Sequence, residues 1–255
     1  MVKGLDRFCE HFEEYSERYI LIGGTACELI MREAGLEFRA TKDLDLVLCV
    51  ESIDPEFVSA FWAFIKAGQY RIQESAEGKP RFYRFQKPAI DDFPSMLELF
   101  SPAPEALLPV EGSHLTPIPV DAEISSLSAI LLDSEYYRWM QSGKKELDHL
   151  SVLGAEHLIP LKARAWLDLH GRKEGGEPVD RRSIKKHRND ILRLFRVIGG
   201  QKRLHLSTQI HRDMSSFLDS LSSEKVDLKS LGLGSITLGD LIEQLRWHYK
   251  MDGKE

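Results

Sequence analysis

Residues 19–50 read YILIGGTACELIMREAGLEFRATKDLDLVLCV, and this stretch decides the fold. The apolar run 19–22 predicts a short strand, which the glycines at positions 23 and 24 interrupt. Residues 26–34 have a helix-forming composition and are followed by a glycine. Residues 43–50 are apolar apart from two aspartates, which indicates a buried strand. The stretch therefore predicts a strand, a turn, a helix and a second strand.

The chain downstream continues this mixed pattern as far as residue 153. Residues 58–67 predict a helix, and residues 81–85 and 96–100 predict strands bounded by prolines. The segment 101–119 is rich in proline and is expected to be an irregular loop. Residues 120–150 are ambiguous between strand and helix.

From residue 154 the signal is helical, so we expect an α+β protein with two domains. A small mixed sheet is expected in residues 1–153 and a helical domain in residues 154–255. Pro160 is compatible with a helix if it lies in the first turn, and Thr237 is a candidate N-cap for the last helix. Apolar residues at helical spacing define three helix faces: Leu158, Leu161, Ala165 and Leu169; Ile184, Ile191, Leu194, Phe195 and Ile198; and Leu238, Leu241, Ile242, Leu245 and Tyr249.

Composition indicates a water-soluble protein with an uneven charge distribution. The 255 residues carry a formal net charge of −6, and no apolar run has the length of about 20 residues that a membrane-spanning helix needs. Residues 162–203 hold 13 Lys and Arg against 5 Asp and Glu, a net +8 that leaves −14 for the rest. We expect a cytoplasmic location, because no stretch resembles a signal peptide.

Asp43 and Asp45 are the most informative residues for chemistry. Residues two apart on a strand point to the same face, so the two carboxylates project together while Leu44 and Leu46 project the other way. Neighbouring carboxylates repel each other, and a hard divalent cation such as Mg²⁺ relieves the repulsion because it prefers oxygen ligands. The pair therefore favours a metal site. An aspartate pair that caps a strand or accepts backbone amides is the alternative.

Gly23, Gly24 and Thr25 lie between the predicted strand and helix, upstream of the aspartate pair. Glycine allows close approach of a ligand to the backbone, and the amides of a helix N-terminus favour an anion such as triphosphate. The alternative is a plain tight turn in which Thr25 caps the helix.

Glu98 is the third acidic candidate, because it lies alone among the apolar residues of segment 96–100. An acid in an apolar strand is costly to bury without a partner, so Glu98 is either a metal ligand or an edge-strand residue facing water. As a ligand it would complete, with Asp43 and Asp45, a site for two metal ions about 3.5–4 Å apart.

These residues together resemble the DNA polymerase β-type nucleotidyltransferase superfamily, whose signature is a Gly-Gly/Ser turn followed by an Asp-x-Asp pair. The resemblance rests on residues 23–25, residues 39–46 and Glu98. Segments 161–165 and 186–191 are in addition similar to the helical motifs of the AbiEii/AbiGii toxin family of nucleotidyltransferases. The similarity extends over residues 19–198.

The resemblance implies a Mg²⁺-dependent transferase that moves a nucleoside monophosphate from an NTP to an acceptor. It also implies a toxin-like protein of a toxin–antitoxin or phage-defence pair, with RNA as the acceptor and an antitoxin protein as a partner. It assigns three groups of catalytic and binding residues: ligands of two Mg²⁺ ions (Asp43, Asp45, Glu98), phosphate-binding residues (Gly23, Gly24, Thr25) and nucleotide-facing residues from two helices (Lys162, Asp190).

The basic residues Lys185, Lys186 and Arg188 would follow an RNA backbone, where each neutralised phosphate releases counterions. A solvated helix face or a surface for an acidic partner is the alternative interpretation. Two other functions are open at this point: nucleotidyl transfer to a small molecule such as an antibiotic, and a non-catalytic, nucleotide-binding regulatory role.

Overall fold

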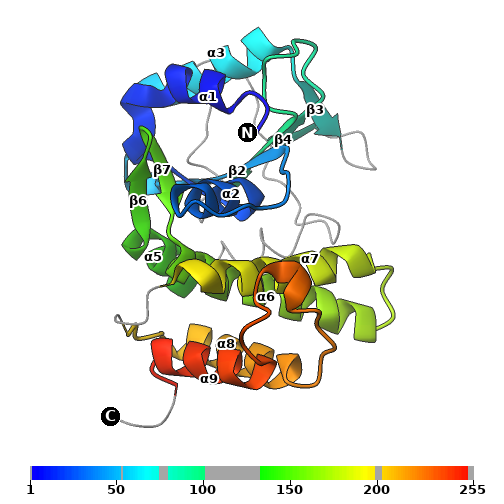
Figure 1. Cartoon of the computed structure of the whole chain (residues 1–255). Coiled ribbons are helices and arrows are strands. Elements are labelled where there is room, and N and C mark those ends of the chain that lie inside the picture. Colours follow the sequence, from blue (N-terminus) through cyan, green and yellow to red (C-terminus); the bar gives the residue numbers. More distant parts are fainter. Residues whose placement is uncertain (1, 53, 75–79, 101–132, 199–202, 252–255) are drawn as a thin grey trace. The chain divides into compact units, whose positions relative to one another are not determined.

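The fold belongs to the α+β class, as the sequence predicts, and the chain divides into two compact units (Figure 1). Among the described residues, the first unit ends at Gly154 and the second begins at Ala155. No helix in the described part of the chain is long and apolar enough to cross a membrane. The computed structural model describes residues 2–52, 54–74, 80–100, 133–198 and 203–251.

The first unit is built on a mixed sheet whose described part has seven strands. These are β1 (Tyr19–Ile22), β2 (Asp43–Leu48), β3 (Arg71–Glu74), β4 (Pro80–Gln86), β5 (Met96–Phe100), β6 (Lys144–Leu147) and β7 (Leu150–Leu153). Their order across the sheet is β3-β4-β5-β2-β1-β7-β6. The pairs β2/β5 and β1/β7 are parallel, and the other neighbours are antiparallel.

Helices cover both faces of this sheet. Figure 1 shows the first and third helices on one side and the second helix on the other. The described helices of this unit are α1 (Leu5–Phe12), α2 (Gly23–Glu33), α3 (Pro55–Gly68) and α5 (Ser134–Ser142), with 3-10 segments at Glu13–Arg18 and Val50–Ser52.

The face under α3 is the apolar core of the unit. Phe85 of β4, which is fully buried, lies with its ring centroid 5.5 Å from that of Phe61 on α3. In register with Phe85 are Leu97 on β5 and, beyond it, Leu44 on β2, so one row of buried side chains crosses three strands. Alternation along each strand therefore sends the intervening residues to the opposite face, on the side of α2.

The turn expected at the two glycines is absorbed into a helix, because α2 begins at Gly23, directly after the last residue of β1. Gly23 adopts a φ of +69°, in the left-handed region that glycine tolerates, and this single residue redirects the chain from strand to helix. The predicted strands at 19–22, 81–85 and 96–100 match β1, β4 and β5 within one residue at each end. The loop predicted at 101–119 lies outside the described residues.

The second unit is helical in its described part. Its helices are α6 (Ala155–Glu174), α7 (Arg181–Leu194), α8 (Thr208–Leu221) and α9 (Leu238–His248), with 3-10 turns at Phe195–Val197 and Lys229–Leu231. Helix α6 packs against both α7 and α8. The predicted N-cap is confirmed, because the Thr237 hydroxyl accepts a hydrogen bond from the Asp240 amide at 3.1 Å.

Pro160 lies inside α6, although a proline was expected to be compatible with this helix only in its first turn. A proline inside a helix has no N–H to donate to the carbonyl four residues earlier, which here is that of Glu156. The hydroxyl of Tyr249 donates to this carbonyl at 2.7 Å instead. Tyr249 is fully buried, and burial raises the pKa of its phenol well above the ordinary value, so the phenol stays a donor. A distant side chain thus replaces the hydrogen bond that Pro160 removes.

We expect Tyr249→Phe to lower the free energy of unfolding by about 1–2 kcal/mol, because the Glu156 carbonyl loses its donor. In a Pro160→Ala background the same substitution should cost less, since a backbone N–H at position 160 can donate to that carbonyl. Urea denaturation followed by circular dichroism measures both costs.

Tyr70→Phe is the matched control, because the Tyr70 hydroxyl also donates to a carbonyl at 2.7 Å, that of Pro94 in the first unit. Its cost should be the same in either background. Equal costs of Tyr249→Phe with and without Pro160 would show that the phenol does not compensate for the proline.

Candidate active site

Two of the three predicted acidic ligands lie side by side on the sheet. Asp45 of β2 is in register with Glu98 of β5, and Asp43 lies two residues earlier on the same face. All three residues are half-buried, whereas the alternate positions Leu44 and Leu97 are fully buried. The alternation predicted from the sequence therefore holds for Asp43 and Asp45, and the pairing of β2 with β5 brings Glu98 beside them.

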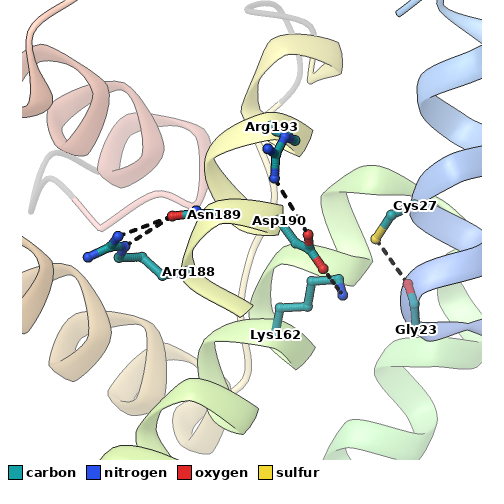
Figure 2. A network of polar contacts seen from close by, with 7 residues as sticks. All are labelled: Gly23, Cys27, Lys162, Arg188, Asn189, Asp190 and Arg193. Carbon is teal, nitrogen blue, oxygen red and sulfur yellow. Dashed lines mark hydrogen bonds and ion pairs between the residues drawn. The ribbon is translucent and has the colours of Figure 1, made fainter. Parts of the chain in front are cut away.

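Asp45 packs directly against the start of α2. A Cβ atom built on Gly23 would lie 1.7 Å from Oδ2 of Asp45, so the carboxylate occupies the space that any other side chain would need. The thiol of Cys27 donates to the carbonyl oxygen of Gly23 at 3.0 Å within the same first turn (Figure 2). Strand β2, which carries the two aspartates, is thus in direct contact with the first turn of α2.

Gly24 and Thr25 also contribute to the contact between α2 and β2. A Cβ on Gly24 would lie 2.8 Å from Cγ2 of Thr41 and 3.2 Å from Nη2 of Arg39, so the segment before β2 also packs closely on this turn. Thr25 is fully buried, and its hydroxyl donates to the Asp43 carbonyl at 2.7 Å. The Thr25 hydroxyl therefore ties α2 to β2. An anion at this turn would meet backbone amides and the cationic Arg39.

Glu98 has an ion-pair partner that the sequence did not reveal. Nε of Arg84, from the register neighbour on β4, donates to Oε1 of Glu98. The two side chains are only 22% and 13% exposed. Arg84 precedes the buried Phe85 within a predicted strand, so alternation alone indicates that its side chain points away from the apolar core. The sequence does not show which strand pairs with β4, so the contact of Arg84 with Glu98 was not deducible.

The chemistry of the three acids suits a hard divalent cation, because all their ligand atoms are carboxylate oxygens. The register places Asp45 and Glu98 in neighbouring positions. Within the described segments, however, no three His, Cys, Asp or Glu side chains are gathered closely enough to hold a metal ion.

The predicted lysine and aspartate of the second unit contact each other. Nζ of Lys162 on α6 lies 2.9 Å from Oδ2 of Asp190 on α7, and the side chains are 5% and 0% exposed (Figure 2). Arg193 lies one turn further along α7, with Nη1 4.0 Å from Oδ1 of Asp190. Removing two charges from water is costly, and the pair offsets that cost only through close, well-oriented contact. Lys162 and Asp190 therefore depend on each other for their buried positions.

The basic surface predicted on α7 is smaller than expected. Lys185 and Lys186 are exposed, but Arg188 is 7% exposed and forms an ion pair with Glu224. Its guanidinium also donates to the side chain of Asn189, as Figure 2 shows. Arg188 lies on the inner side of the helix together with Ile184 and Ile191, so it is not placed to contact an external phosphate.

No model of a known protein family matches the chain, and neither curated proteins nor solved structures give a match. The geometry on its own defines a place on the interior strands β2 and β5 where carboxylates, a guanidinium and the first turn of a helix meet.

We expect Gly23→Ala to destabilise the first unit far more than Gly35→Ala. Both glycines adopt a φ of +69°, so both substitutions carry the backbone cost of about 1–2 kcal/mol for a left-handed alanine. Only Gly23 faces Asp45, whereas nothing lies within 4 Å of a Cβ on Gly35. Thermal unfolding measures the difference, and equal losses for the two variants would contradict the close contact.

Proposed function

We propose that this protein is a Mg²⁺-dependent nucleotidyltransferase that transfers a nucleoside monophosphate from an NTP to an acceptor hydroxyl. The observation that carries the proposal is the position of Asp45, between Glu98 on the next strand and Gly23 at the first turn of α2. Phosphoryl transfer depends mainly on positioning and charge neutralisation, so adjacent carboxylates and a phosphate-binding turn supply its essential parts.

Asp43, Asp45 and Glu98 would hold the metal, and the amides at the start of α2 would hold the triphosphate. Bound Mg²⁺ would supply stabilisation of the negative charge that develops on the phosphates and acidity for the acceptor hydroxyl. The α2 N-terminus follows Ile22, whose side chain has no acceptor to cap it, so the first-turn amides suit an anion. Because Gly23 touches Asp45, the metal-binding carboxylate and the phosphate-binding amides would be only a few atoms apart.

Lys162 and Asp190 would bind the nucleotide as a coupled pair. The resemblance of their segments to the toxin family suggests that the lysine contacts the nucleotide. The ion pair at 2.9 Å supports a division of roles, in which Asp190 orients the amine of Lys162 from the neighbouring helix. Thr25 and Gly24 would contribute through the backbone of the phosphate-binding turn.

We further propose RNA as the acceptor, an antitoxin protein as the partner and the cytoplasm as the site of action, in a toxin–antitoxin or phage-defence system. The exposed Lys185 and Lys186 on α7 support a polyanionic acceptor, together with Arg181 and Arg182, which are also exposed on the first turn of that helix. The buried Arg188 is not part of this surface.

The test of the reaction is incubation with each labelled NTP, Mg²⁺ and total RNA. We expect label to enter RNA with the natural chain, and Asp45→Asn to reduce the rate by at least about 100-fold, because a metal-binding carboxylate is lost. Asp91→Asn is the matched control, since the Asp91 side chain is fully exposed and pairs with the half-exposed Lys3 at 3.2 Å.

The outcomes separate the candidate functions. Label in a small molecule instead of RNA would support the antibiotic-type alternative. No transfer to any acceptor, with NTP binding intact, would support a regulatory protein. Equal rates for Asp45→Asn and Asp91→Asn would refute the catalytic site.

If RNA is the acceptor, the double substitution Lys185→Gln with Lys186→Gln should weaken RNA binding and reduce its dependence on salt concentration. NTP binding should be unchanged, because Lys185 and Lys186 are not among the residues proposed to bind the metal or the nucleotide. The double substitution Lys225→Gln with Lys229→Gln removes the same charge from other exposed positions and serves as the control. Electrophoretic mobility shifts across a salt series measure the effect, and identical slopes for the two double variants would argue against α7 as the RNA surface.

A further inference from the structure

Three polar side chains form a row across the sheet on the face opposite the apolar core. Arg84 on β4 is in register with Glu98 on β5, and Glu98 is in register with Asp45 on β2. The alternate residues Phe85 and Leu97 are fully buried, and the ring of Phe85 contacts that of Phe61 on α3. Glu98 therefore has a cationic neighbour on one side and an anionic neighbour on the other.

The Glu98 carboxylate is held on the cationic side of the row. Its Oε1 accepts from Nε of Arg84, and the pair is largely shielded from water. Strand β5 lies between β4 and β2, so a carboxylate drawn towards Arg84 is drawn away from Asp45. A cation shared by Asp45 and Glu98 needs the opposite orientation of the same side chain.

We propose that Arg84 and a divalent cation bind Glu98 in competition, so that Arg84 sets the metal affinity of the carboxylate site. This inference rests on the metal site of the proposed function. Without metal, the guanidinium neutralises Glu98. On metal binding, the carboxylate exchanges Arg84 for a cation held together with Asp45.

The physical basis of the competition is that a half-buried carboxylate needs a positive partner in either state. A charge-assisted hydrogen bond is about twice as strong as a neutral one, so breaking it opposes metal binding directly. The guanidinium charge also lies one strand away from the metal position and repels a cation there. Both effects act in the same direction and weaken the affinity for metal.

The test is direct measurement of Mn²⁺ binding by calorimetry, without nucleotide, for the natural chain and for Arg84→Met. We expect the substitution to decrease the Mn²⁺ dissociation constant about tenfold, which corresponds to the loss of one competing charged hydrogen bond. Mn²⁺ should also raise the melting temperature of Arg84→Met by more than that of the natural chain, since the unpaired Glu98 gains a partner.

Two controls separate exchange at Glu98 from a general effect of charge. The combination of Arg84→Met with Glu98→Gln should lose the gain in affinity, because no carboxylate is released. Arg18→Met removes an arginine that pairs with Asp54 at 2.5 Å in the same unit, and it should leave Mn²⁺ binding within twofold of the natural value. Arg84→Gln serves as a second variant if Arg84→Met does not fold.

Asp45→Asn distinguishes this inference from the proposed function. If Mn²⁺ binding depends on Asp45 but Arg84→Met binds no more tightly, or more weakly, the metal site stands and the competition is overturned. A gain that persists with Glu98→Gln also overturns it. If no variant binds Mn²⁺ through Asp45, the proposed metal site fails and the competition fails with it.

Discussion

The contact between Asp45 and Gly23 is the constraint on which the rest of the first unit depends. The carboxylate fills the space of a Cβ at residue 23, and the glycine there has the positive φ that turns the chain from β1 into α2. One position therefore sets the direction of the helix and its distance from β2. Thr25 reinforces the junction by its hydrogen bond to the Asp43 carbonyl. These contacts hold β1, β2 and the start of α2 in one arrangement, with Asp43 and Asp45 beside the helix.

Much of this arrangement was readable from the sequence, because alternation and glycine placement are local signals. Residues 43–50 predicted a strand with both aspartates on one face, and β2 has that pattern. The adjacency of Glu98 and Asp45 was not deducible, since it depends on the parallel register of β2 and β5. The ion pair of Arg84 depends on a second register, between β4 and β5, and was missed.

The predictions for Pro160 and Arg188 in the second unit also failed because the contacts that decide them join residues far apart in the sequence. Pro160 was considered compatible with a helix only in a first turn because a proline removes a helical hydrogen bond, and nothing local to it indicates a replacement donor. That donor, Tyr249, lies 93 residues beyond the Glu156 carbonyl that it contacts. Arg188 was interpreted as part of an exposed basic face, but its partner Glu224 lies 36 residues further along the chain. Long-range polar contacts leave no periodic trace in a sequence.

Asp190 in the second unit and Glu98 in the first share one solution to the cost of desolvation. Asp190 is paired with Lys162 across two helices, and Glu98 is paired with Arg84 across two strands. Each acid thus has a cation from a neighbouring element before any ligand is present, which lets the chain fold with carboxylates in sheltered positions. The two pairs differ in exposure, because the Lys162–Asp190 contact is almost completely shielded whereas Arg84 is 22% exposed. A partly exposed pair is cheaper to separate than a fully shielded one, since water can solvate the released charges. The Arg84–Glu98 pair is therefore the one suited to exchange partners, and the Lys162–Asp190 pair is the one suited to keep its geometry.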